Sequence, residues 1–255
     1  MDALHVQRWG EGPPVLLVHG SVTNGEMAWS AQQPLADRWS LVVPDRRGYF
    51  PNLPAEREDF EIDARDIAEM LGDGMHLVGH SYGGVIALLA AAQRPAAVRS
   101  LTVIEPPAFD LVRGNAEVEE WLAQAIAFWA NGPRDPEAFL RAFLTVVGAD
   151  AALPSPLPPP LLQSARLLQV ERPPWEAHIP VAELSAQPFP KLVVSGGHSA
   201  VFDAACDALE SGLGAQRAVI PGAGHSVQQT GAPFNARLED FLREAETVAG
   251  SRRHA

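Results

Sequence analysis

A serine stands at a tight turn between a buried strand and a helix. The segment Gly-His-Ser-Tyr-Gly at positions 79–83 follows the apolar run 75–78 and precedes the apolar run 85–92. Small neighbours allow a strained strand-to-helix turn that projects the Ser81 hydroxyl from the carboxyl edge of a sheet. The N-terminus of the following helix directs free N–H groups to the same place. We therefore predict that Ser81 is a nucleophile; a glycine-rich turn without chemistry is the alternative.

A second segment supplies the donors that an attacking serine needs. Acyl transfer places negative charge on a carbonyl oxygen. Each fixed N–H group that donates a hydrogen bond to this oxygen lowers the barrier by about 3 to 4 kcal/mol. The run Pro14–Val18 ends in His-Gly-Ser-Val at positions 19–22. We predict that the backbone N–H groups of Ser21 and Tyr82 form this oxyanion hole, and that His19 bonds its own backbone.

The third candidate is a histidine that follows the last predicted strand. The segment 219–225 has the sequence Val-Ile-Pro-Gly-Ala-Gly-His. A neutral imidazole at such a strand end can take the proton of Ser81 and return it to a leaving group. His225 is therefore the predicted general base. Among the other histidines His198 is the main rival, because it lies beside the mouth of the predicted site.

The elements that must position these residues are those of an α/β protein. Continuous apolar runs are typical of strands in a parallel sheet that helices cover on both faces. The predicted strands are 15–18, 41–43, 75–78, 101–104, 191–194 and 218–220. The predicted crossover helices are 62–71, 83–93, 200–213 and 233–248. This alternation predicts the α/β fold class.

An insertion interrupts the alternation. Its pattern predicts two helices, 118–129 and 136–147. Its proline-rich stretch 154–160 predicts an ordered connector, because proline can neither continue a helix nor donate a ladder hydrogen bond. The predicted domains are a core of residues 1–105 and 190–255 and a helical cap of residues 106–189.

These motifs resemble those of the α/β-hydrolase superfamily: His-Gly after one strand, Gly-x-Ser-x-Gly after another and Gly-x-Gly-His after the last. The segment 43–49 also resembles that family's Asp-x-Arg-Gly turn, which is structural there. The resemblance covers nearly the whole chain. It implies a mostly parallel sheet of eight strands, or seven if the first is missing, with one antiparallel edge strand. It also implies that the cap follows the sixth strand.

The chain departs from the family pattern at the acid of the catalytic triad. The family usually places an aspartate at the end of Gly-x-x-Asp after the seventh strand, and this chain has Gly-Gly-His-Ser at 196–199. Serine cannot hold a negative charge beside an imidazole, and loss of the acid can cost about 10⁴ in rate. We predict that Glu105, at the end of the preceding strand, orients His225; Asp203 and Asp110 are the remaining candidates. This arrangement resembles the Ser-His-Glu branch that includes hydrolases of resorcylic macrolactones such as zearalenone.

The aromatic residues of the insertion suggest an apolar substrate. Side chains that close over a catalytic serine exclude water and hold an apolar or aromatic acyl group. The expected contacts with substrate are those of Trp175, Val22, Phe128 and His198. The aromatic side chains at helical spacing are expected to pack inside the insertion.

Composition excludes several other functions. The chain has 31 acidic and 19 basic residues and a net charge of −12, which repels nucleic acid. Its single cysteine cannot form an internal disulfide, no apolar run approaches a membrane span, and the N-terminus lacks a signal-peptide pattern. We expect a cytoplasmic protein without membrane or nucleic-acid partners, and a homodimer is compatible with the sequence. No cluster of ligands has metal-binding spacing on one element, so we expect no metal and no cofactor.

The sequence therefore predicts a cofactor-free serine hydrolase of a carboxylic ester or lactone with a bulky apolar part. Ser81 attacks, His225 acts as base and then acid, Glu105 orients it, and water resolves the acyl-enzyme. A hydrolase of carbon–carbon bonds in β-diketone-like compounds would use the same residues. A ligand-binding homologue without catalysis is the alternative from another class, because serine replaces the usual acid at position 199.

Overall fold

A sheet of seven strands organises the computed structural model, which describes residues 4–149 and 152–252. The strands are β1 (Val6–Trp9), β2 (Pro14–Val18), β3 (Ser40–Pro44), β4 (Met75–His80), β5 (Val98–Ile104), β6 (Lys191–Ser195) and β7 (Gln216–Val219). Their order is β1-β3-β2-β4-β5-β6-β7. β1 pairs antiparallel with β3, and the other pairings of the described strands are parallel. The predicted class is confirmed in its seven-stranded form.

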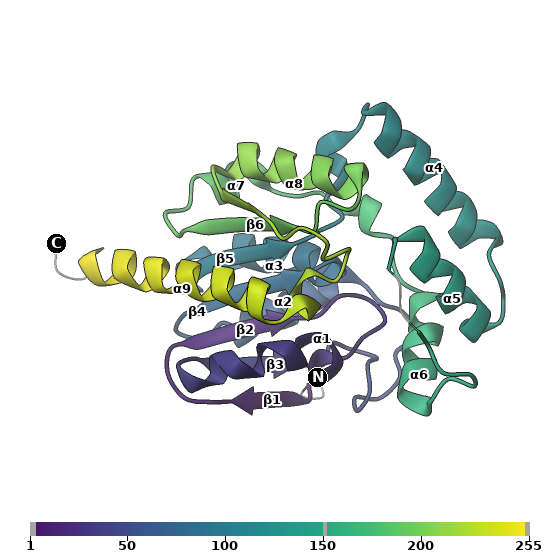
Figure 1. Cartoon of the computed structure of the whole chain (residues 1–255), viewed down its shortest axis with the longest axis horizontal. Coiled ribbons are helices and arrows are strands. Elements are labelled where there is room, and N and C mark those ends of the chain that lie inside the picture. Colours follow the sequence, from purple (N-terminus) through teal and green to yellow (C-terminus); the bar gives the residue numbers. More distant parts are fainter. Residues whose placement is uncertain (1–3, 150–151, 253–255) are drawn as a thin grey trace.

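Strands β1 to β6 contribute apolar side chains to two cores, one on each face of the sheet. Leu16 and Val18 of β2 face a core that contains side chains of the helices α2 (Phe60–Met70), α3 (Tyr82–Gln93) and α8 (Ala200–Leu213). Val15 and Leu17 face a core that contains side chains of α1 (Gly25–Trp29) and α9 (Ala232–Arg252). Successive side chains of a strand point to opposite faces, so burial on both faces explains the continuous apolar runs. Figure 1 shows the helices arranged on the two sides of the sheet.

Nine α-helices and five short 3₁₀ helices are present in the described part of the chain. The α-helices are α1 (Gly25–Trp29), α2 (Phe60–Met70), α3 (Tyr82–Gln93), α4 (Ala116–Asn131), α5 (Pro136–Val146), α6 (Pro159–Leu168), α7 (Val181–Ser185), α8 (Ala200–Leu213) and α9 (Ala232–Arg252). The 3₁₀ helices are η1 (Ser30–Asp37), η2 (Pro95–Ala97), η3 (Phe109–Val112), η4 (Pro174–Glu176) and η5 (Val227–Thr230). None of the helices in the described ranges has the length and apolarity needed to cross a bilayer.

The inserted helices α4, α5 and α6 gather at one end of the sheet (Figure 1). They follow β5, the fifth described strand. The predicted position after strand six was counted in the eight-stranded form, and with the first strand of that form missing β5 takes the sixth place. The start of α5 is explained locally: the Asp135 side chain accepts the Ala138 N–H at 2.9 Å, and a proline occupies the first turn.

The predicted C-terminal end of the connector 154–160 is wrong, because α6 begins at Pro159. Proline is tolerated in the first turn of a helix, where its missing N–H group would have no partner. The chain then returns to the core beside Glu58: the Arg172 N–H donates to the Glu58 carbonyl oxygen at 2.8 Å, and Glu58 and Glu171 form an isolated parallel bridge. This bridge attaches the end of the insertion to the core.

Candidate active site

The turn between β4 and α3 holds Ser81 in a strained backbone conformation. Its φ is 54° and its ψ is −124°, a combination that L residues rarely adopt. The Ser81 N–H donates to the Ile104 carbonyl oxygen at 2.8 Å. A Cβ on Gly79 would lie 2.3 Å from the Gly83 carbonyl oxygen, so only glycine fits there. The surrounding sheet and helix thus fix the position of the Ser81 hydroxyl.

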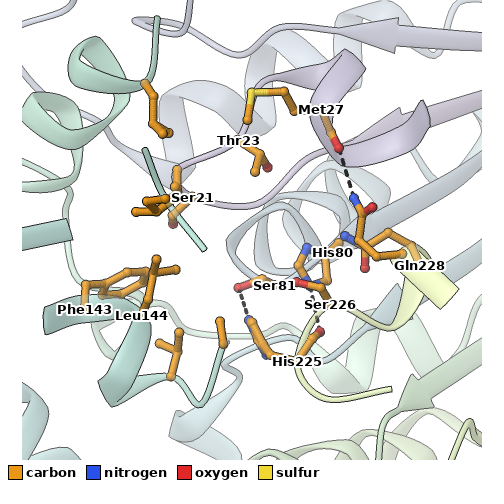
Figure 2. Close-up of a pocket in the computed structure, with 16 residues that line it drawn as sticks. Ser21, Thr23, Met27, His80, Ser81, Phe143, Leu144, His225, Ser226 and Gln228 are labelled. Atoms are coloured by element: carbon orange, nitrogen blue, oxygen red, sulfur yellow. Dashed lines mark hydrogen bonds between the residues drawn. The ribbon is translucent and has the colours of Figure 1, made fainter. Parts of the chain in front are cut away.

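His225 lies beside Ser81, on the loop after β7. Its Nε2 is 2.9 Å from Ser81 Oγ, a distance suited to proton transfer. The Nε2–H group of His80 donates to the His225 carbonyl oxygen at 3.0 Å, so the residue before the serine holds the loop that carries the imidazole. Figure 2 shows both hydrogen bonds on His225.

Glu105 extends this chain of hydrogen bonds from the end of β5. Its Oε2 is 3.3 Å from His225 Nδ1, and its Oε1 accepts the Gly196 N–H at 2.7 Å. The residue is fully buried, and its φ of 48° marks a sharp change of direction at the strand end. A carboxylate at this place favours the ring proton on Nδ1, which leaves Nε2 free to accept the proton of Ser81.

The other two candidate acids are engaged elsewhere. Asp203 pairs with Arg217 at 3.2 Å, and Asp110 accepts a backbone N–H group near the end of the insertion at 2.8 Å. Among the described carboxylates, that of Glu105 contacts Nδ1 of His225. The geometry therefore favours Glu105 over both rivals.

Burial disfavours the charged forms of both Glu105 and His225. It raises the pKa of Glu105 to about 7, although the hydrogen bond from Gly196 acts in the opposite direction. It lowers the pKa of His225 to about 3, and the nearby His198 contributes to the same shift. At neutral pH the imidazole is therefore neutral and can accept a proton.

The raised pKa of Glu105 predicts the acidic limb of the pH–rate profile. A protonated Glu105 donates to Nδ1 of His225, which places the ring proton on Nε2 and removes the acceptor for the Ser81 proton. Ionisation of the pair at about pH 7 frees Nε2, so we expect kcat/KM to rise about tenfold per unit below this pH and to level off above it. A profile from about pH 5 to about pH 9 measures the limb. A limb at the pKa of an ordinary carboxyl group would contradict this assignment.

The loop after β2 presents the predicted oxyanion donors. The Val22 N–H donates to the Tyr49 hydroxyl oxygen at 3.2 Å. The Ser21 hydroxyl donates to the Glu171 carboxylate. Within residues 4–149 and 152–252, no acceptor is seen for the backbone N–H of Ser21 or of Tyr82. Ser21 and Ser81 line the same pocket. The role of the two N–H groups as an oxyanion hole stays a prediction.

A buried ionic cluster supports this loop from behind. The Arg46 guanidinium contacts Glu58 at 2.5 Å and Asp63 at 2.6 Å. It also donates to the carbonyl oxygens of His19 and Gly20, each at 2.9 Å. His19 Nδ1 bonds the Gly20 carbonyl oxygen at 2.8 Å, which confirms the predicted local role of this histidine. We name Arg46, Glu58 and Asp63 the Arg46 cluster; it anchors the loop 19–22 to α2.

A pocket of about 180 Å³ opens onto Ser81 and is walled by both the core and the insertion (Figure 2). Most of its surface is apolar. The insertion contributes Phe143, Leu144, Val147, Ala149, Leu153 and Leu161. The core contributes Ser21, Val22, Thr23, Met27, His80, Ser81, His225, Ser226, Gln228 and Gln229.

Of the four predicted substrate contacts, the structure places Val22 in the wall of this pocket and the other three outside it. Phe128 and Trp175 each pack edge-on against Trp129, with ring centroids 5.3 Å apart in both pairs. Aromatic rings at this spacing stabilise one another and the insertion. His198 lies beside the buried acid of the site, 3.6 Å from its carboxylate oxygen, and not on the pocket wall.

The fold and the site together define a hydrolase of the α/β class. Its serine lies on a strained strand-to-helix turn after β4, and the acid and the histidine follow in that chain order after β5 and β7. The chain belongs to the alpha/beta hydrolase family, whose model matches residues 15–237.

Individual relatives are also hydrolases. The chain is 29% identical to 2-(acetamidomethylene)succinate hydrolase of Mesorhizobium japonicum over 248 residues, which cover 89% of this chain and 86% of that protein. It is 34% identical to pimeloyl-[acyl-carrier protein] methyl ester esterase of Aeromonas salmonicida over 110 residues, or 42% of this chain and 43% of that protein. The chain thus spans less than half the length of that esterase.

Solved structures show the same fold. A thermophilic esterase from Thermogutta terrifontis has a TM-score of 0.64 and 25% identity, with 95% of this chain and 93% of that chain covered. An alpha/beta hydrolase from Sphaerobacter thermophilus has a TM-score of 0.69 and 24% identity, with 94% and 96% covered.

Proposed function

We propose that the protein is a serine hydrolase that cleaves a carboxylic ester or a lactone through an acyl-enzyme. The observation that carries this proposal is the continuous chain from Ser81 Oγ to His225 Nε2 at 2.9 Å and from His225 Nδ1 to Glu105 at 3.3 Å. Such a chain activates a hydroxyl group that is unreactive by itself. The name of one relative, a methyl ester esterase, agrees with ester chemistry.

Each residue of the site has a defined role in the proposed reaction. His225 accepts the proton of Ser81 as Oγ attacks the carbonyl carbon, and ionised Glu105 stabilises the imidazolium. The N–H groups of Ser21 and Tyr82 hold the oxyanion. His225 then gives the proton to the leaving oxygen, and the ester bond to that oxygen breaks. A water molecule attacks the acyl-enzyme by the same steps and regenerates Ser81.

The volume of the pocket supports a compact acyl group. At about 180 Å³ it is close to the roughly 150 Å³ of an apolar cavity that holds benzene. Apolar side chains of α5 and α6 supply much of its wall. A short branched chain or a single ring fits this volume, so we propose a smaller acyl group than the aromatic residues of the insertion suggested.

A second hollow, of about 480 Å³, suits the leaving group. It is lined by residues 148–149, 222–226 and 229–230. We name the pocket of about 180 Å³ the acyl pocket; His225 lines both it and this hollow. Because His225 must deliver its proton to the leaving oxygen, the leaving group lies on the side of this residue. Roughly half of the surface of the hollow is polar, so we propose a polar alcohol portion.

Covalent labelling tests the nucleophile. We expect a fluorophosphonate to add one group to the protein, with loss of fluoride, and none to the Ser81→Ala variant, as measured by intact mass. A panel of aryl esters, lactones and ring-cleavage diketones then tests the reaction. Turnover of the diketones alone would replace ester hydrolysis by carbon–carbon hydrolysis. A protein that is not labelled would instead be a ligand-binding homologue.

Shortening one wall residue is expected to change the acyl preference. Leu144→Ala enlarges the acyl pocket, and one methylene group in an apolar pocket is worth about 1 to 3 kcal/mol. We expect kcat/KM for acyl chains a few carbons longer to rise about tenfold relative to the shortest chain. A series of p-nitrophenyl esters measures this ratio. The control is Leu162→Ala, which alters the packing of the insertion outside the pocket; an equal effect of both variants would refute the assignment of the pocket.

A further inference from the structure

Two histidines share the carboxylate of Glu105. His225 Nδ1 lies 3.3 Å from Oε2, and His198 Nδ1 lies 3.6 Å from the same oxygen. In the described part of the chain these three residues form a group whose ligand atoms all lie within 4.8 Å of one another. His198 has no role in the proposed hydrolysis. Two imidazoles and one carboxylate are a donor set that binds Zn²⁺.

The spacing of the donor atoms is close to that of a tetrahedral metal site. Bonds of about 2.0 to 2.2 Å place neighbouring ligand atoms about 3.3 to 3.6 Å apart. The two distances to Glu105 Oε2 have these values. A ring nitrogen of one imidazole lies within 4.8 Å of a ring nitrogen of the other, so a side-chain movement of about 1 Å would complete the geometry.

The surroundings of the group allow an ion to enter and hold the carboxylate in place. The His198 side chain is 17% exposed and follows Gly197, whose φ is 62°. The ion can therefore reach the group past His198, and water can fill the fourth position. On the opposite side, the Gly196 N–H fixes Oε1 of Glu105 at 2.7 Å, the kind of outer contact that orients a metal ligand.

We propose that Glu105, His198 and His225 bind a divalent transition-metal ion such as Zn²⁺, and that the bound ion switches hydrolysis off. The ion takes Nδ1 of neutral His225, and the ring proton moves to Nε2, so the ring neither gains nor loses a proton. Nε2 then donates to Ser81 Oγ and cannot accept its proton. Neither His198 nor Glu105 lines the acyl pocket. The ion therefore lowers kcat and leaves KM unchanged. The inhibition of hydrolysis, unlike the binding of the ion, rests on the proposed function.

Direct binding tests the metal site without any need for activity. Equilibrium dialysis of the Ser81→Ala variant against Zn²⁺ is expected to give one ion per chain. Adding His198→Gln is expected to raise Kd about 100-fold. The matched control is His178→Gln, because His178 is an exposed histidine that lies 3.4 Å from the carboxylate of Asp110; it is expected to leave Kd unchanged. Equal affinity with and without His198 would overturn the site.

Inhibition tests the switch. We expect Zn²⁺ to lower kcat at constant KM, EDTA to restore the rate, and Mg²⁺, which prefers oxygen ligands, to have no effect. With each variant compared with its own metal-free rate, His198→Gln should require about 100-fold more Zn²⁺ for half-inhibition. Zn²⁺ binding without any esterase activity would refute the proposed function and keep the site. Activity without His198-dependent binding would refute the site and keep the function.

Discussion

Replacing Glu105 by glutamine is expected to lower kcat by about 10⁴ with little change in KM. The reason lies in how the amide must orient. The Gly196 N–H donates to Oε1 at 2.7 Å, so the amide oxygen takes that place and the NH₂ group faces His225 Nδ1. Nδ1 then accepts a hydrogen bond, and the ring proton moves to Nε2. The general base is blocked while the acyl pocket is unchanged.

The matched control for this variant is Asp203→Asn. Asp203 pairs with Arg217 and lies in the usual acid-bearing region of the family, so the substitution removes a charge near the site without touching His225. We expect kcat to fall less than tenfold. Steady-state kinetics of the two variants decide the matter: a larger loss with Asp203→Asn would move the role of the acid to that residue.

The same Glu105 substitution is expected to stabilise the fold at alkaline pH. Burial raises the folded-state pKa of Glu105 to about 7, above its value in the unfolded chain, so the folded protein binds this proton more tightly. The free energy of unfolding therefore falls as the pH rises from about 4.5 to about 7 and then levels off. Above pH 7 Glu105→Gln avoids this cost, and we expect a gain of roughly 1 to 3 kcal/mol in urea unfolding. Equal stability of both proteins at all pH values would contradict the raised pKa.

Removing the guanidinium of Arg46 is expected to cost about 3 to 5 kcal/mol of folding free energy. Arg46→Met leaves the carboxylates of Glu58 and Asp63 buried without the cation that neutralises them, at 2.5 and 2.6 Å in the native protein. It also removes the donor to the carbonyl oxygens of His19 and Gly20 in the loop 19–22. Urea unfolding at neutral pH measures the loss, and kcat of the folded fraction is expected to fall as well.

The neighbouring arginine provides the comparison for Arg46. Arg47 pairs with Asp66, and the two side chains are 28% and 12% exposed. A partly exposed pair is worth about 0 to 1 kcal/mol, so Arg47→Met should cost no more than that. A similar loss of unfolding free energy in the two variants would show that the Arg46 cluster stabilises the fold no more than a partly exposed ion pair does.

The sequence predicts the sheet well because burial on both faces makes strands continuous and apolar. All six strands expected from such runs overlap observed strands, and Ala200–Leu213 is found with its predicted ends. The helix α1 was missed because its five residues are too few for a periodic pattern. The helix α6 was missed because its first two residues are prolines, which were interpreted as the end of a connector.

The site is predictable where residues follow strand ends, and less so elsewhere. Ser81, Glu105 and His225 follow β4, β5 and β7, and the carboxyl ends of these parallel strands lie at one edge of the sheet. The pocket wall depends instead on how α5 and α6 fold back, which no local pattern encodes; Leu144 and Leu161 were not expected there. The group of Glu105 and two histidines was also missed, because its members come from three different loops and have no ligand spacing in the sequence.

The order in which the chain is made determines when the site can work. His225 comes 144 residues after Ser81 and 120 residues after Glu105, and it follows β7, the edge strand that pairs with β6 alone among the described strands. A nascent chain still on the ribosome, folded as far as β5, holds the serine and the acid but no imidazole between them. Hydrolytic competence therefore arises only after the edge strand docks, so partly synthesised chains are expected to be inert.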